Sequence, residues 1–156
     1  MYRSFKWAMA YLAPTGIGQN SVPNTDEGSK SQLDAIRVLE LRKAIQTLRS
    51  TGGMKEVPLW LQGQGVMAGV TLYAGLFEPD ITRFDLYDLP KSHKQSSFLK
   101  NAQPILDLPQ TVAFALENSQ VILYQADEEG WDYPASVSKL LKWNNKLQIR
   151  TPPSSQ

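Results

Sequence analysis

The sequence predicts an α/β fold, a mostly parallel sheet of about five strands with helices on both faces, which makes a three-layer sandwich. Short apolar runs typical of buried strands alternate with longer segments of helical period. Helical segments, and not the tight turns of hairpins, join these runs, which is typical of parallel sheets. With 156 residues, 42% of them hydrophobic, the chain falls in the range of one domain. We expect that domain at residues 1–150 and a disordered tail at residues 151–156.

Five apolar runs are expected to be strands because each is short and is followed by turn-forming or polar residues. In order, they are Trp7–Ala13, Val57–Gln62, Arg83–Leu89, Gln120–Ala126 and Lys146–Arg150. The first run follows two basic residues and therefore also resembles a short signal peptide. Its Trp and Tyr, and the Pro and Gly residues that follow it, favour a strand.

Four segments are expected to be helices, because their apolar residues recur at three- and four-residue steps or because they begin at a proline. They are Gln32–Ser50, Val66–Phe77, Pro109–Leu116 and Pro134–Trp143. Ser31 can cap the first helix at its start, and Gly52 can end it. The second segment has almost no polar side, so we expect it to be a buried, central helix.

The composition argues against several classes of protein. The 16 basic and 15 acidic residues nearly cancel and are scattered, so nucleic acid is not an expected partner. The absence of Cys excludes disulfides, thiolate catalysis and cysteine-bound metals, and it is compatible with a cytoplasmic location. No apolar run is long enough to span a membrane, so no membrane partner is expected either.

Ligands of parallel sheets bind at the carboxyl ends of the strands. In the predicted fold, this rule selects the loops at residues 63–65, 88–97 and 127–132. The sequences around these loops include Leu59-Trp60-Leu61-Gln62-Gly63-Gln64-Gly65, Leu72-Tyr73-Ala74-Gly75-Leu76-Phe77-Glu78-Pro79, Pro90-Lys91-Ser92-His93, and Val121-Ile122-Leu123-Tyr124 before Asp127. Together with the order of the predicted elements from Gln32 to Arg150, these sequences resemble the C-terminal half of an α/β-hydrolase, particularly of the acetyl-xylan-esterase-like branch.

The resemblance implies an ester-hydrolase site built on a strand-to-helix turn of sequence G-x-S-x-G. Gly63 and Gln64 match its first two positions, Gly65 stands in place of the nucleophilic Ser, and Met67 replaces the last Gly. In that superfamily the acid and then the His follow the nucleophile. Asp127 stands where the acid is expected, but no His follows it in the chain.

His93 is the only His of the chain and the candidate general base, because its ordinary pKa lies near neutrality. It would activate Ser92 or a water molecule, with Asp127 or Asp88 orienting the ring. The alternative is a solvated loop His without a catalytic role. The turn residues 63–65 are the candidate substrate-binding and oxyanion donors, with the Gln64 amide as the side-chain donor; alternatively, Gln64 is a polar turn residue.

Four carboxylates, Asp127, Glu128, Glu129 and Asp132, follow one predicted strand. Oxygen ligands at this density suit a divalent cation such as Ca²⁺, which would polarise a carbonyl or activate water. The alternative is a solvated acidic loop in which Asp132 caps the next helix. No other cofactor is expected.

These residues together predict a small hydrolase that acts on an ester or lactone carbonyl, through water or Ser activated by His. The alternative is a catalytically inactive hydrolase-like binding or interaction domain, or a fragment of a larger hydrolase. Because a truncated sheet exposes an edge or a face, self-association through the sheet edge is also expected.

Overall fold

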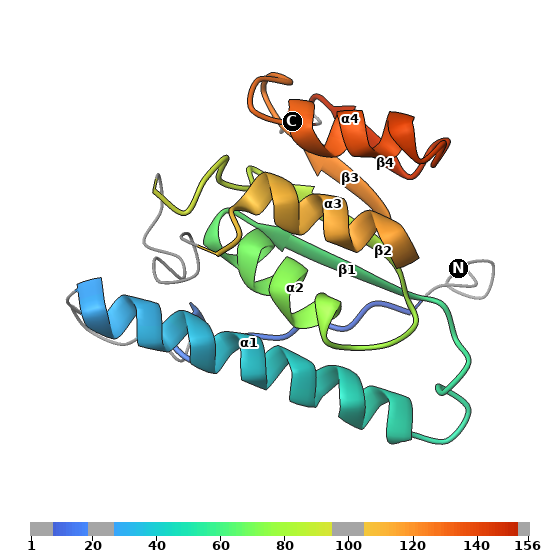
Figure 1. The fold of residues 1–156 in the computed structure, drawn as a ribbon. Helices are drawn as coiled ribbons and strands as arrows, with labels where there is room; N and C mark the ends of the chain where they lie inside the picture. Colours follow the sequence, from blue (N-terminus) through green and yellow to red (C-terminus); the bar gives the residue numbers. More distant parts are fainter. Residues whose placement is uncertain (1–7, 19–26, 95–104, 153–156) are drawn as a thin grey trace.

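Four parallel strands form the sheet of this protein in a computed structural model that describes residues 8–18, 27–94 and 105–152 (Figure 1). The strands are β1 (Leu59–Gln64), β2 (Ile81–Tyr87), β3 (Gln120–Tyr124) and β4 (Leu147–Arg150). Each pairs with the next one along the chain, so the spatial order is β1-β2-β3-β4. The α/β class and four of the five expected strands are confirmed.

The helices alternate with the strands, as the sequence predicts. They are α1 (Glu27–Ser50), α2 (Val66–Leu76), α3 (Leu108–Asn118) and α4 (Asp132–Leu140). Figure 1 shows them as one layer on one face of the sheet, with α1 against α2, α2 against α3 and α3 against α4. Right-handed crossovers that all advance in the same direction place every connecting helix on the same face. The described residues therefore form two layers, and the third layer of the expected sandwich is not among them.

The core lies between the sheet and this helix layer. Strand register aligns two rows of side chains on the helix-facing side: Leu61, Phe84, Val121 and Leu147 in one, and Gly63, Leu86, Leu123 and Ile149 in the other. Phe84, Leu86 and Leu123 are at most 1% exposed. α2 comes so close to this layer that a Cβ at Gly75 would overlap the Phe84 ring. Because the core is packed this tightly, only a residue without a side chain fits at this position of α2.

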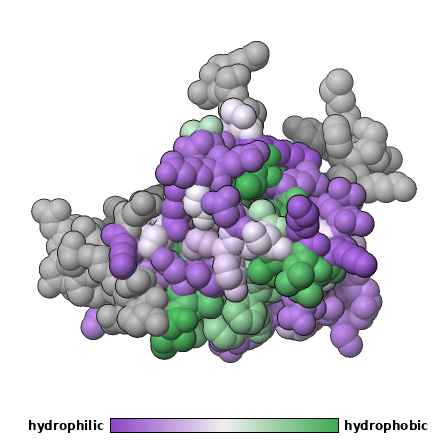
Figure 2. All heavy atoms as spheres, turned by 45° about the horizontal axis from the view of Figure 1, so that its top comes forward, coloured by the Kyte–Doolittle hydropathy of each residue, from purple (hydrophilic) through white to green (hydrophobic). Residues whose placement is uncertain are grey.

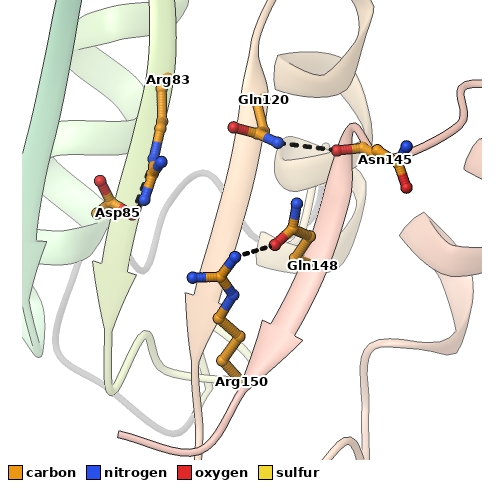
Figure 3. A network of polar contacts seen from close by, with 6 residues as sticks. All are labelled: Arg83, Asp85, Gln120, Asn145, Gln148 and Arg150. Carbon is orange, nitrogen blue, oxygen red and sulfur yellow. Dashed lines mark hydrogen bonds and ion pairs between the residues drawn. The ribbon is translucent and has the colours of Figure 1, made fainter. Parts of the chain in front are cut away.

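The opposite face of the sheet is polar and aromatic. Its side chains are Trp60, Gln62 and Gln64 from β1, Arg83, Asp85 and Tyr87 from β2, Gln120, Ile122 and Tyr124 from β3, and Gln148 and Arg150 from β4. Arg83 pairs with Asp85 at 2.7 Å (Figure 3). The Arg83 guanidinium also lies 4.4 Å from the centre of the Trp60 ring. Nearby, Gln120 donates to the Asn145 carbonyl at 3.0 Å, and Arg150 donates to Gln148 (Figure 3).

Three local expectations are wrong. Residues 8–13 form no strand; Trp7 lies outside the described residues. A strand needs a hydrogen-bonded neighbour, and no described strand pairs with these residues. Ser31 is not the cap of α1, because the helix begins four residues earlier at Glu27. Asp132 is the first residue of α4, after Trp131 in the cap position.

The surface is mixed in character. On the face shown in Figure 2, polar residues surround several separate apolar patches. None of the described helices is both long and apolar enough to cross a membrane.

Candidate functional site

The carboxyl ends of the strands lie side by side, held by backbone hydrogen bonds beyond each strand. The amide of Gly65 donates to the Tyr87 carbonyl at 2.9 Å, and that of Asp88 donates to Tyr124 at 3.0 Å. The amide of Gln125 continues the pattern to Arg150 at 2.9 Å. The three loops that the sequence selected therefore begin at one edge of the sheet, as parallel strands require.

The turn between β1 and α2 depends on Gly65, whose φ is 57° and ψ is −127°. This is a positive φ that residues with a side chain adopt only at a cost. A Cβ at Gly65 would have no heavy atom within 4 Å, so the position faces open space. At Gly63, by contrast, a Cβ would lie 2.6 Å from the Met67 carbonyl oxygen and 2.6 Å from Thr71 Oγ1. Gly63 is needed for close packing of α2 on β1, and Gly65 for the backbone angle.

The Gln64 amide is already engaged across the strand ends. Its Nε2 donates to Asp88 Oδ2 at 3.0 Å, on the exposed side of the turn. In this arrangement the amide links the β1 and β2 loops. This bond uses one of the two N–H groups of Nε2, and the role of the amide toward an oxyanion stays a prediction.

His93 is fully buried, which differs from the solvated loop His considered as an alternative. Its Nε2 lies 2.9 Å from the hydroxyl oxygen of Tyr73 on α2, and the two ring centres are 5.7 Å apart. The Thr111 hydroxyl from α3 donates to the same Tyr73 oxygen at 3.3 Å, and burial raises the pKa of Tyr73. His93 thus contacts α2 directly and is linked to α3 through the Tyr73 hydroxyl.

Asp107 organises this loop, although sequence reasoning did not select it. It caps α3 by accepting from the Leu108 amide at 2.9 Å, and it accepts from the His93 amide at 2.8 Å and the Ser92 hydroxyl at 2.6 Å. Burial alone would raise the pKa of Asp107, but these three hydrogen bonds outweigh burial and hold the pKa below its usual value. The sequence signal was an Asp directly before Leu108-Pro109, the usual pattern of a cap followed by a proline in the first turn.

Asp127 pairs with Lys91. Its Oδ1 lies 2.7 Å from the Lys91 ammonium and accepts from the Glu129 amide at 3.0 Å. The hydrogen bond between the two side chains raises the pKa of Lys91 and lowers that of Asp127. Asp127 therefore ties the β3 loop to the β2 loop at the surface, with 56% of its side chain exposed.

The predicted site residues divide into two groups. Ser92 and His93 join Asp107, Tyr73 and Thr111 in one network, which we call the Asp107 network. Asp127, in contrast, contacts Lys91 and not the imidazole whose orientation it was expected to fix. Ser92 directs its hydroxyl to a carboxylate oxygen and accepts from the Lys94 amide at 3.1 Å. Sequence reasoning missed Tyr73 and Thr111 because their contacts join distant parts of the chain.

The acidic loop does not gather its carboxylates around a point. Among residues 8–18, 27–94 and 105–152, no three His, Asp or Glu side chains are close enough to share a metal ion. Asp127, Glu128, Glu129 and Asp132 all fall within these ranges. Glu129, 87% exposed, approaches Lys91 at 3.7 Å, so the loop makes ion pairs with a cation of the chain itself.

A scan against protein-family models and searches of curated proteins and of solved structures found no significant match to this chain.

Proposed function

We propose that this chain is a catalytically inactive, α/β-hydrolase-like interaction domain. The observation that carries the proposal is Gly65, which has the positive φ typical of a strand-to-helix elbow but no side chain to act as a nucleophile. Two further features support the hydrolase-like description. The strands follow one another in space as they do in sequence, and Gly63 allows α2 to pack closely on β1.

The contacts of the candidate catalytic residues support the absence of catalysis. Nucleophilic catalysis needs a nucleophile and a base within hydrogen-bonding reach, with a third group that orients the base. Here His93 is buried against Tyr73, Ser92 donates to Asp107, and Asp127 binds Lys91. Each group already has a partner that contributes to the fold, so reaction with a substrate would require these contacts to break.

The open face of the sheet supports an interaction role. It presents Trp60, Tyr87 and Tyr124 together with Arg83 and Arg150, and it carries no Lys or Glu. Trp, Tyr and Arg are enriched at protein interfaces, whereas Lys and Glu are depleted there. Tyr87 and Tyr124 stack with their ring centres 4.1 Å apart, so the aromatic surface is ordered before a partner binds.

A second candidate function is the hydrolysis of a small ester or lactone by water that His93 activates. The observation in its favour is the elbow itself, because such turns direct backbone amides toward a developing oxyanion. In this candidate His93 would exchange Tyr73 for water, and no metal ion would be needed.

Hydrolysis of a panel of short-chain esters and acyl lactones separates the two candidates. We expect wild-type rates equal to those in buffer, and equal rates for His93→Gln and Asp127→Asn. Gly65→Ser supplies the missing hydroxyl, and we expect it to remain unlabelled by a fluorophosphonate because, apart from its two chain neighbours, no heavy atom of the described residues lies within 4 Å of a Cβ at this position. A wild-type rate above buffer that His93→Gln removes would replace our proposal with the hydrolase.

A further inference from the structure

The two edges of the sheet differ in their protection against pairing with another chain. β4 has four residues, ends at Arg150 and follows Lys146. Short, charged edge strands resist the addition of a further strand. β1 has six residues, Leu-Trp-Leu-Gln-Gly-Gln, none of them charged and none a proline. The sequence of β1 therefore lacks the charged residues and prolines that usually prevent strand addition.

Backbone groups on the outer side of β1 point away from the sheet. The Gly65 amide donates toward β2, and successive residues of a strand point to alternate sides. The amides of Gln62 and Gln64 consequently point to the side opposite β2, where no described strand lies. Hydrogen-bonding groups in this arrangement can accept a strand of similar length.

The same chain has an exposed apolar segment, which we call the arm: residues 8–12, Ala-Met-Ala-Tyr-Leu. Met9 is 75% exposed, Tyr11 88% and Leu12 48%. Five consecutive apolar residues facing water are costly unless another surface covers them. The composition of the arm is typical of a strand, and the sequence predicts one there, yet the arm forms no strand.

The chain holds the C-terminal end of the arm in a fixed place. Thr15 donates to Glu40 on α1 through its amide at 2.9 Å and its hydroxyl at 2.5 Å. Arg37 donates to the Thr15 carbonyl at 2.9 Å, and Pro14 is buried. Because this anchor is formed, the residues before it leave α1 at a defined position.

We infer that two copies of this chain exchange arms, with residues 8–12 of each copy adding as a strand to the β1 edge of the other. Neither the arm nor β1 carries a charged side chain, and the lengths of the two segments differ by one residue. An exchange with two-fold symmetry covers both exposed features in both copies at once, as in domain-swapped dimers. The inference rests on the proposed interaction role, and it names the partner as a second copy.

Light scattering coupled to size-exclusion chromatography tests the dimer. We expect the wild-type chain to have twice the mass of one chain, and Tyr11→Lys with Leu12→Lys to have the mass of one. The control is Leu140→Lys on α4, a leucine that is 79% exposed outside the arm, which should remain dimeric. Circular dichroism verifies that each variant is folded. A monomeric wild type at its highest soluble concentration, or a dimer that keeps its mass in the arm variant, overturns the inference.

The absence of Cys makes cross-linking diagnostic for exchange between copies. Protein with Ala10→Cys is mixed with a size-tagged protein that carries Gln62→Cys or Gln64→Cys, and the mixture is oxidised. We expect a disulfide between the two proteins for at least one of these pairs. The control is a size-tagged protein with Leu140→Cys, which should form no disulfide with the Ala10→Cys protein. If a chain that carries both cysteines closes only upon itself, the arm pairs with its own β1 and the exchange is refuted. Neither result depends on ester hydrolysis, so failure of the dimer and failure of the proposed function are distinguishable.

Discussion

The two faces of the sheet are made by alternate residues of the same four strands, yet they differ in nearly every property. The helix-facing rows are apolar, buried and crowded, so glycine is required where α2 approaches. The opposite rows consist mainly of amides, arginines and aromatic rings, with Asp85 as the partner of Arg83 and Ile122 buried among them. This difference teaches that the fold depends mainly on one face, and our proposal assigns recognition to the other. The Asp107 network lies at the strand ends and combines burial with polar contacts.

The largest expected effect is in the apolar face. Phe84→Ala removes a ring that is 1% exposed and should cost about 3–5 kcal/mol of unfolding free energy. Phe114→Ala, on the outer side of α3 and 58% exposed, should cost about 0.5 kcal/mol or less. Chemical denaturation of both variants provides the comparison. Similar losses would show that the core is not where the structure places it.

A smaller loss is expected when the close approach of α2 is obstructed. Gly63→Ala places a methyl group 2.6 Å from a backbone oxygen, and we expect a loss of about 1–3 kcal/mol. Gly52→Ala, where a Cβ meets nothing within 4 Å and φ is not positive, is the matched control and should be nearly neutral. Thermal unfolding of the pair measures the difference. Equal stability would contradict the tight packing of α2 on β1.

Asp107→Asn is expected to cost about 1–2 kcal/mol near neutral pH, because a charged acceptor of three hydrogen bonds is replaced by a neutral amide. The folded state lowers the pKa of Asp107, so its ionised form contributes stability above the unfolded pKa of about 4. That contribution is lost as the pH falls through the folded pKa. The difference between wild type and variant should therefore shrink in acid, as denaturation at several pH values would show. A difference independent of pH would mean that the charge does not stabilise the network.

The smallest effect is expected on the polar face. Arg83→Lys gives up the hydrogen-bonding fork to Asp85 and weakens the contact with Trp60, and should cost about 0.5–1 kcal/mol in these partly exposed surroundings. The loss should decrease with added salt, measured by denaturation at low and high ionic strength. A loss as large as that of Phe84→Ala would remove the distinction between the faces.

The sequence predicted the order and type of nearly all elements because apolar period and turn residues are local properties. The observed α2, for example, begins where predicted and ends one residue earlier, at Leu76. The single helical layer was missed, although polar Gln62 and Gln64 alternate with Leu61 and Gly63 in β1, and β4 alternates apolar and polar residues throughout. Alternation of this kind indicates that one face of the sheet lacks an apolar cover.

Less of the candidate site could be predicted, because its contacts join residues far apart in the chain. The sequence drew attention to His93, but the partner Tyr73 lies 20 residues away on the central helix. Asp107 looked like an ordinary residue before a helix, and its bonds to Ser92 and His93 join residues 15 and 14 positions apart. The arm was predicted as a strand because its composition favours one. Composition does not show, however, whether another strand lies beside it to form hydrogen bonds.

The matching order of the strands in space and in sequence bears on how the protein is made. As the chain leaves the ribosome, each new strand finds its neighbour already synthesised, because β2 adds to β1, β3 to β2 and β4 to β3. No strand needs a later strand to be inserted between it and its neighbour. The chain segments that must close into loops between paired strands are therefore short. The growing protein is therefore expected to become ordered progressively from β1, with β4 as the last part added.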